Sequence, residues 1–346
     1  MSNAAAVLAA IRREGPLSRA AIAELTSLSM PTVSRQVAAL TEARLVRDVP
    51  DLARVGAVGR PRVPVDIDDT VLAACGVHVG VRTTTFGLVD LRGRLVGSER
   101  VSTPRGSAED GLAFLAAKVR AFLRRWRDRR VVGLGLATGG QVDVARGLVT
   151  HERLGWHRVP AGTVLSRGTG LPVHVDGHVP AMAHAELLFG EGKQYPSLLY
   201  FYARQVVGAA IVVDGVLHRG PGQAGTIAHL PIGGDVRCPC GRTGCLEATI
   251  NAQTDRGAFA ERAATMGRAV AILRDLVNPD HVVLGGQNIT DAPEHLATLL
   301  HTFAATTALP GTDLVTVTRF GPDVQAVAAC TGVLAGVYTD PTPLMD

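Results

Sequence analysis

Three of the five cysteines lie close together in the segment Cys238-Pro-Cys240-Gly-Arg-Thr-Gly-Cys245, and His229 precedes the first of them by nine residues. The glycines in this segment allow the backbone to turn all three sulfur atoms towards one point. Three thiolates and one imidazole would complete the tetrahedral shell that structural zinc prefers, and they would leave no position open for a reacting water. We therefore predict structural zinc held by His229, Cys238, Cys240 and Cys245, with free thiols as the alternative.

The charge distribution indicates a second kind of chemistry, at the start of the chain. Residues 1–62 hold nine Arg or Lys against five Asp or Glu, a difference of +4, whereas the remaining residues hold 26 of each sign. Because the whole formal excess lies in this segment, we expect a nucleic-acid-binding module attached to a neutral body.

Helix signals in the same segment predict a helix-turn-helix. A first helix is followed by a second that begins at Ser18, with Ile22 and Leu25 facing inward, and by a third that Ser29 caps. The buried stripe of the third helix is Val33, Val37 and Leu40. On its other side Arg suits guanine and Gln suits adenine, so we predict base contacts from Thr32, Ser34, Arg35 and Gln36. A scaffold or a dimerisation element is the alternative.

Two short strands, at residues 45–47 and 63–67, predict a wing after the third helix. The loop between them carries Arg60 and Arg62, which could enter a minor groove. An exposed loop that happens to be rich in arginine is the alternative.

Length and hydropathy place these chemistries in a globular protein. The 346 residues are 47% hydrophobic, which is enough for two or three domains with packed cores. No apolar run reaches the ~18 residues of a membrane span and no secretory leader is evident, so we expect a cytoplasmic protein.

From Ala73 onwards strands and helices alternate, and a weak internal repeat appears. Strand-turn-strand units at residues 75–101 and 198–213 contain the similar sequences Gly87-Leu-Val-Asp90 and Ile211-Val-Val-Asp214. The repeat predicts two related α/β halves, and we expect the last helix, over residues 323–337, to pack back on the first half.

The cysteine motif also carries a family resemblance. Ala224-Gly-Thr-Ile-Ala-His229, followed by Cys-x-Cys-Gly-x-x-Gly-Cys-Leu-Glu247, resembles the signature of the ROK family (repressor, open reading frame, kinase), which holds bacterial sugar kinases and sugar-responsive repressors. The winged arrangement resembles the repressor branch. The resemblance implies an α/β fold, with a winged helix-turn-helix followed by a two-half actin-like (ribonuclease H-like) domain that carries the zinc loop. The implied domains are residues 1–68, residues 71–180 with 322–346, and residues 181–321.

Three motifs that serve phosphoryl transfer in the family's kinases are altered here. The kinases have Asp-x-Gly-Gly-Thr-Lys where this sequence has His78-Val-Gly-Val-Arg-Thr83, and Gly-Thr-Gly-x-Gly where it has Arg204-Gln-Val-Val-Gly208. Valine resists the φ > 0 conformations that glycine allows beside a phosphate. The catalytic Asn-Asp of the kinases falls on Gly177-His178. We therefore expect kinase activity to be lost, and keep an ATP-dependent sugar kinase as the alternative.

The resemblance further implies a ligand site between the two halves, of which a part remains. Glu247 could accept two hydroxyls and His229 could offer its second nitrogen, although Glu247 could instead only brace the zinc loop. The residues expected around an effector are Glu247, His229, His178, Asp176 and Trp156. We expect a DNA-binding transcriptional regulator, a repressor that forms a homodimer or homotetramer on an inverted-repeat operator and responds to a sugar or sugar-like effector. A different small molecule, or no ligand, is the alternative.

Overall fold

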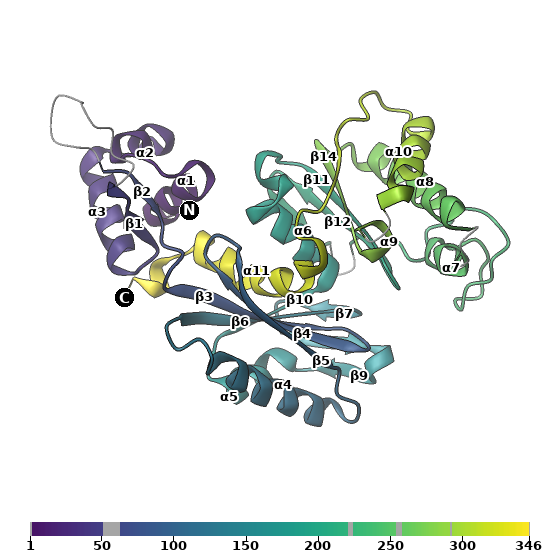
Figure 1. Ribbon diagram of the computed structural model, residues 1–346, viewed down its shortest axis with the longest axis horizontal. Coiled ribbons are helices and arrows are strands. Elements are labelled where there is room, and N and C mark those ends of the chain that lie inside the picture. The colour runs from purple at the N-terminus through teal and green to yellow at the C-terminus, as the bar shows by residue number, and fades with distance from the viewer. Residues whose placement is uncertain (1, 51–62, 221–223, 254–257, 291–292, 346) are drawn as a thin grey trace. The chain divides into compact units, whose positions relative to one another are not determined.

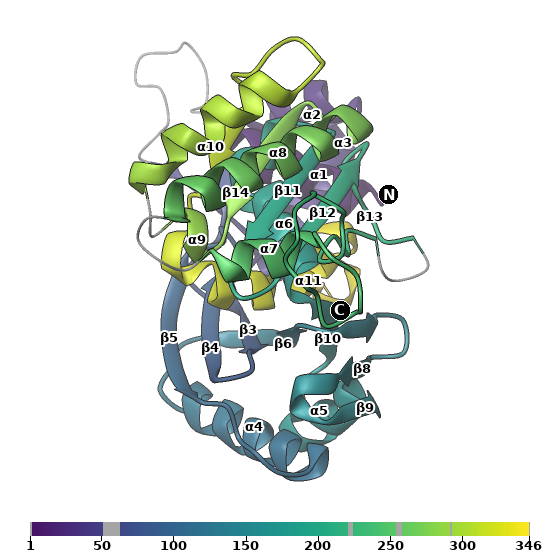
Figure 2. The same ribbon diagram turned by 90° about the vertical axis from the view of Figure 1, so that its right-hand side faces the viewer.

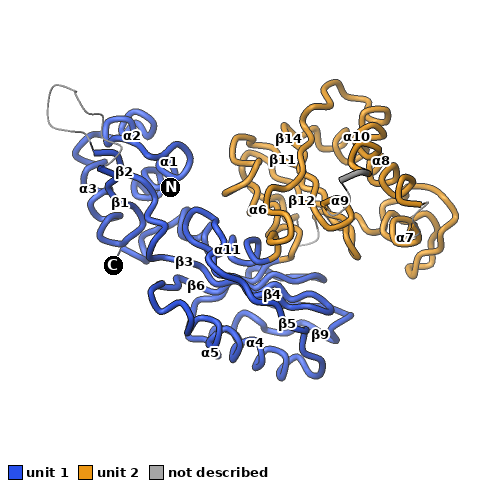
Figure 3. Tube along the Cα trace, viewed as in Figure 1, with its two compact units in different colours: residues 1–176, 326–346 blue, residues 177–325 orange. Residues whose placement is uncertain are grey.

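The computed structural model describes residues 2–50, 63–220, 224–253, 258–290 and 293–345 (Figure 1). The chain forms two compact units, which Figure 3 shows in different colours. Unit 1 comprises residues 1–176 and 326–346, and unit 2 comprises residues 177–325. In the described part of the chain, no helix has both the length and the apolar character needed to cross a bilayer.

The N-terminal part of unit 1 is a helix-turn-helix followed by a strand pair. Its elements are α1 (Asn3–Glu14), α2 (Arg19–Thr26), α3 (Met30–Glu42), β1 (Val46–Asp48) and β2 (Val65–Ile67). Ser2, Ser18 and Ser29 cap the three helices through their side-chain oxygens, as expected for two of them from the sequence. β1 and β2 pair antiparallel, which confirms the predicted strands. The loop that joins them carries Arg60 and Arg62 and lies outside the described residues.

One predicted core residue of this domain is not buried. Ile22 is 0% exposed, as predicted, but Leu25 is 54% exposed. A step of three residues turns a helix by about 300°, so Leu25 lies about 60° away from Ile22 around α2. The interior is already filled by Val33, Val37 and Leu40 of α3, all 0% exposed, and the last turn of the short α2 remains at the surface.

The rest of unit 1 is a five-stranded sheet with helices on both faces (Figure 1). The strand order is β5-β4-β3-β6-β10. Its strands are β3 (Leu72–Val79), β4 (Thr83–Asp90), β5 (Leu95–Ser102), β6 (Arg130–Thr138) and β10 (Val173–Gly177). The helices α4 (Ala108–Leu123) and α5 (Ala161–Thr169) cover one face. A Cβ at Gly135 would collide with the carbonyl oxygen of Ala329, so this glycine permits the close approach of α11 (Val324–Thr339) to the other face.

A small three-stranded sheet in unit 1 was not predicted. It consists of β7 (Gln141–Asp143), β8 (Leu148–His151) and β9 (Trp156–Val159). These strands are three or four residues long, which is too short for a period of two to stand out in the sequence.

Unit 2 repeats the same sheet topology. Its strand order is β13-β12-β11-β14-β15, three antiparallel strands followed by two strands that continue the sheet in parallel. The strands are β11 (Leu198–Ala203), β12 (Val207–Val213), β13 (Val216–His218), β14 (His281–Gly285) and β15 (Val315–Val317). Counted along each half, both sheets have the order 3-2-1-4-5. The predicted pair of related α/β halves is therefore confirmed.

Helices cover both faces of the second sheet as well. α8 (Phe259–Val277) and α10 (Pro293–Thr306) lie side by side over one face, as Figure 2 shows. α6 (His178–Phe189) lies on the other face, where a Cβ at Gly208 of β12 would be 3.0 Å from the side chain of Val179. The short α7 (Leu246–Ala252) follows the cysteine segment, and α9 (Gln287–Thr290) follows β14.

Candidate functional site

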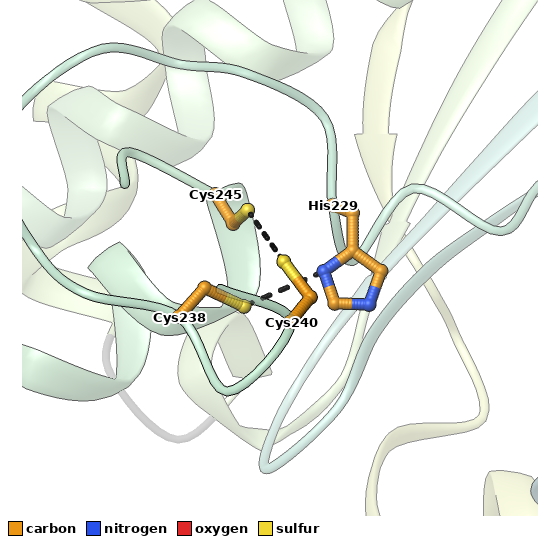
Figure 4. A group of neighbouring side chains, drawn as sticks. All are labelled: His229, Cys238, Cys240 and Cys245. Atoms are coloured by element: carbon orange, nitrogen blue, oxygen red, sulfur yellow. Dashed lines mark hydrogen bonds between the residues drawn. The ribbon is translucent and has the colours of Figure 1, made fainter. Parts of the chain in front are cut away.

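Four side chains of unit 2 meet where the sequence predicts a metal site (Figure 4). His229, Cys238, Cys240 and Cys245 place one nitrogen and three sulfur atoms within 4.8 Å of one another. The Sγ of Cys238 lies 3.5 Å from Nδ1 of His229, and the Sγ atoms of Cys240 and Cys245 lie 3.7 Å apart. A tetrahedral ion at about 2.3 Å from sulfur and about 2.1 Å from nitrogen would hold a sulfur and the nitrogen about 3.6 Å apart, and two sulfurs about 3.8 Å apart. The four residues therefore fit one tetrahedral metal ion.

Tight glycine turns bring the ligands together. Gly241 and Gly244 adopt φ angles of 89° and 69°, a region that side chains with a Cβ rarely enter. The amide of Cys238 donates to the carbonyl oxygen of Arg242 at 2.8 Å and closes the loop. A Cβ at Gly244 would lie 2.8 Å from the carbonyl oxygen of Gly233, so glycine is required there. Because these turns are local, the sequence could predict the cluster.

The thiols of the cluster differ in how easily they lose a proton. Hydrogen bonds from the backbone amide of Arg242, and then from its side chain, lower the pKa of the Cys240 thiol to about 6. Burial raises the pKa of the Cys245 thiol to about 11. A metal ion binds thiolates, so its charge would have to displace the proton from Cys245. Four protein ligands would fill a tetrahedral shell and leave no position open for a reacting water.

Glu247, the first predicted effector residue, lies in the first turn of α7 beside the cluster. Its Oε2 accepts a hydrogen bond of 2.9 Å from the amide of Val207, at the start of β12. Its own amide donates to the carbonyl oxygen of Ala228 at 3.0 Å, next to His229. The contact with Val207 joins residues that are 40 positions apart in the sequence. It agrees with the alternative stated from the sequence, in which Glu247 braces the zinc loop. Among the described residues, no hydrogen bond or ion pair involves the other carboxylate oxygen of Glu247, which could accept a ligand hydroxyl.

The other predicted effector residues lie in three different settings. The ring of His178, the first residue of α6, lies 5.3 Å from the ring of Tyr202 within unit 2. Asp176 belongs to unit 1, is 3% exposed and has an oxygen 3.8 Å from Nε2 of His174. Trp156 is 4% exposed and packs in the core of unit 1, so it has little surface to offer a ligand.

The turn that would bind phosphate in a kinase is occupied by the protein's own contacts. The amide of Arg204 donates to the carbonyl oxygen of Val206, and the amide of Val207 donates to Glu247. The side-chain amides of Asn288 and Asn251 donate to the carbonyl oxygens of Arg204 and Gln205 at 2.8 and 3.1 Å. A carboxylate therefore takes an amide that phosphate would need. These asparagine contacts span 84 and 46 residues, so no local sequence signal could reveal them.

We expect no phosphoryl transfer from ATP to a hexose. The turn lacks the glycine-rich backbone that approaches phosphate in the kinases, and the backbone amides of Arg204 and Val207 already donate to other groups. A coupled assay of ADP release, run over a panel of sugars with a known sugar kinase as the positive control, measures it. Turnover above background that disappears in His178→Ala would contradict the expectation.

The residues of α3 that were predicted to contact DNA differ in their exposure. Ser34 and Arg35 of α3 are exposed, whereas Thr32 and Gln36 are half-buried. The hydroxyl of Thr32 lies 2.9 Å from Oγ of Ser29, the residue that caps α3. Ser34 and Arg35 are therefore the predicted contacts that the helix leaves most accessible.

Comparisons with known proteins agree with both parts of this geometry. The sequence profile of the ROK family matches residues 74–254, and a profile of a helix-turn-helix domain matches residues 2–49. The transcriptional regulator Rv0485 of Mycobacterium tuberculosis is 41% identical, over 98% of this chain and 86% of its own length. The DNA-binding transcriptional repressor Mlc of Escherichia coli is 27% identical, over 71% of this chain and 62% of its own length.

A solved structure supports the fold. The crystal structure of a ROK family transcriptional regulator, described as a homolog of the Escherichia coli Mlc protein, superposes with a TM-score of 0.77. It covers 97% of this chain and 98% of the solved one at 22% identity. The helix-turn-helix and both α/β halves are therefore arranged along the chain as in that structure.

Proposed function

Since this chain belongs to the ROK family and carries a helix-turn-helix domain, it is a DNA-binding transcriptional regulator, and we propose that it is a repressor released by a sugar or sugar-like effector. The observation that carries the proposal is the pairing of an exposed Arg35 on α3 with a former phosphate turn whose amides are taken by Glu247 and Val206. Arg35 can contact base edges, whereas the turn has no free amides of Arg204 and Val207 to bind the phosphates of ATP. The alternative of a sugar kinase is disfavoured for the same reason.

We propose an inverted-repeat operator bound by a homodimer or homotetramer. Two recognition helices related by a twofold axis contact two half-sites a whole number of DNA turns apart. Selection of binding sites from random DNA by the full chain should return such a repeat.

We propose that the bound metal is zinc. Three thiolates with one imidazole are a ligand set that zinc favours, and the separations between the ligand atoms match those that zinc's bond lengths require. When bound, the ion cross-links the loop from His229 to Cys245 to the start of α7. It thereby fixes the position of Glu247 two residues further on.

The proposed effector contacts lie beside this metal loop. The second ring nitrogen of His229 points away from the sulfurs in Figure 4, and Glu247 has a second carboxylate oxygen. An imidazole and a carboxylate, held rigidly, suit the hydroxyls of a sugar or another polyol. The hydroxyl-binding set of the family's kinases is incomplete here, which favours a modified sugar over plain glucose.

The DNA-binding domain is held firmly against the first α/β half within unit 1. The carboxylate of Asp69 forms ion pairs with Arg47 of β1 and with Arg92 and Arg94 of the β4–β5 turn. The nitrogen–oxygen distances are 3.3, 3.4 and 3.1 Å. Arg129 donates to the backbone carbonyl oxygen of the same residue at 2.6 Å. Asp69 is 13% exposed, so this is a partly buried network rather than an isolated surface pair.

A second contact ties the same domain to the C-terminal helix. The guanidinium of Arg12, in α1, lies 5.1 Å from the ring centre of Tyr338 in α11, and the Tyr338 hydroxyl donates to the carbonyl oxygen of Leu91. Burial lowers the pKa of Arg12 and raises that of Tyr338. A rearrangement of the first half would therefore carry the DNA-binding domain with it, which is how we propose that effector binding changes operator affinity.

Asp69→Asn should loosen this junction. Loss of one charge shared by three arginines should cost about 1.5–3 kcal/mol, which for a small domain lowers its unfolding temperature by on the order of 10 °C. Calorimetry should then resolve a separate, earlier transition for the DNA-binding domain. Asp48→Asn is the matched control, because Asp48 is half exposed and pairs with Arg19 inside that domain. A single transition unchanged in both variants would contradict a firm junction.

The effector proposal predicts reciprocal coupling. A ligand that weakens operator binding, by ~5–150-fold for typical allosteric coupling, must itself bind more weakly when the operator is present. Calorimetric titration of sugars and polyols, with and without operator, measures both. Glu247→Ala should lose ligand binding, whereas Glu261→Ala, an exposed glutamate of α8, should not. A ligand whose affinity is the same in every titration would refute this site.

A further inference from the structure

The surface of α3 that faces away from the core is a single stripe. From Met30 to Ala38, the exposed residues of α3 follow the spacing i, i+1, i+4, i+5 and i+8, which is one side of a helix. They are Met30, Pro31, Ser34, Arg35 and Ala38, and Glu42 in the last turn is exposed on the same side. The opposite side carries the three fully buried core residues. This stripe, which we name the reading face, is the surface that a helix-turn-helix presents to the major groove.

The reading face combines small residues at its centre with two long side chains at its edges. At about 100° per residue, Met30 and Arg35 project about 140° apart around the axis, with Pro31, Ser34 and Ala38 between them. Small central residues let the helix approach base edges closely. Met30 and Arg35 can then reach past the backbone on either side, one with an apolar group and the other with a guanidinium.

Met30 stands out chemically on this face. Its side chain is 47% exposed, although it begins a helix that otherwise buries its large apolar residues. Among the described residues, the other exposed large apolar side chain of the DNA-binding domain is Leu25, on α2. Single exposed apolar residues are ordinary at surfaces, so exposure alone does not indicate a role for Met30. Its position does indicate one, because the first residues of a recognition helix contact base edges.

We propose that Met30 is a specificity-determining residue that recognises a thymine in each half-site through the C5-methyl group. That methyl is the apolar feature of the major-groove edge, and a flexible thioether packs well against it. Thr32 is less suited to this contact, since its hydroxyl lies 2.9 Å from the capping Ser29. The inference rests on the proposed function, in that it presumes specific DNA binding.

The spacing on the helix also predicts the operator. Met30 and Arg35 are separated by about 7.5 Å along the axis, at about 1.5 Å per residue. Base pairs stack at about 3.4 Å, so this axial separation corresponds to at most about two base-pair steps for a helix lying in the groove. If Arg35 binds guanine, each half-site should contain a thymine within about two base pairs of that guanine.

The test removes one methyl group at a time from the DNA. In a selected operator, each thymine is replaced singly by deoxyuridine, which differs from thymidine by the methyl alone. The affinities of the full-length wild type, Met30→Ala, Met30→Leu and Leu25→Ala are measured on every DNA. At one thymine per half-site, deoxyuridine should weaken wild-type binding about fourfold, the loss expected from removing one buried methyl group.

The variants decide whether Met30 makes that contact. Met30→Ala should bind the unmodified operator about fourfold more weakly per half-site and lose no more at that position on deoxyuridine. Met30→Leu, which keeps an apolar side chain, should retain sensitivity to the methyl, and Leu25→Ala should behave as wild type. If Met30→Ala keeps every methyl effect of the wild type on a specific operator, the inference fails and the regulator function stands. If the wild type binds no selected operator specifically, the proposed function fails and this inference with it.

Discussion

Cys245→Ser should release the metal ion and destabilise unit 2. Cys245 is 2% exposed, its Sγ lies 3.7 Å from that of Cys240, and the residue directly precedes α7. Serine would leave three ligands and a buried hydroxyl. Structural zinc contributes about 10–16 kcal/mol in small zinc-dependent peptides. A loop within a larger folded unit should lose a smaller share, about 3 kcal/mol or more, which lowers the unfolding temperature by about 6–12 °C.

Metal analysis and thermal unfolding measure this expectation together. Freshly purified, reduced wild type should hold one zinc per chain, and a chelator should lower its unfolding temperature towards that of Cys245→Ser. The chelator should not affect the variant. Cys75→Ala is the control, because Cys75 is a buried cysteine of unit 1 outside the cluster and should keep the zinc. Wild type without zinc, or a variant that unfolds like wild type, would contradict the metal site.

What the sequence predicted correctly was encoded locally. Ser18 and Ser29 mark the starts of α2 and α3 through their own hydrogen bonds to the helix amides. The cysteine loop is specified by Gly241 and Gly244, whose positive φ angles turn the chain within a few residues. Caps and tight turns depend on neighbours along the chain, so a single sequence is enough to recognise them.

What the sequence did not predict depends on contacts between distant segments. Leu25 follows the helical spacing of a core residue, yet the packing of α3 leaves it exposed. Glu247 accepts a hydrogen bond from Val207, 40 residues away in the sequence. Together with the missing glycines, this contact explains why the turn offers no free amide of Val207 to phosphate. Burial and pairing of this kind are decided by the whole fold.

The same limit applies to the DNA-binding residues. The amino-acid types of α3 suggested Thr32 and Gln36 as readily as Ser34 and Arg35, because hydrogen-bonding capacity is a property of the type. Exposure depends on where α1 and α2 cover the helix, and it favours Ser34 and Arg35 while adding Met30. Ranking contacts within a recognised helix-turn-helix therefore requires the structure.

Arg35→Ala should weaken operator binding by about 5–150-fold per half-site, the equivalent of the 1–3 kcal/mol that a bidentate arginine–guanine contact contributes. Arg35 is exposed at one edge of the reading face, on a helix anchored by the buried Val33, Val37 and Leu40. Its substitution should leave folding unchanged, since no core contact is lost. Binding to non-specific DNA should fall much less, because phosphate contacts from the rest of the domain remain.

Fluorescence anisotropy on operator and non-specific DNA separates base reading from charge. Arg13→Ala is the matched control: it removes the same charge from the same domain, at the end of α1, where the side chain is 61% exposed and pairs with Glu14. It should weaken both DNAs slightly and equally. Arg35→Ala should lose the preference for guanine at one base pair per half-site, tested with 7-deazaguanine, which removes the N7 acceptor. Equal losses on both DNAs would mean that Arg35 holds phosphate and that another residue reads the guanine.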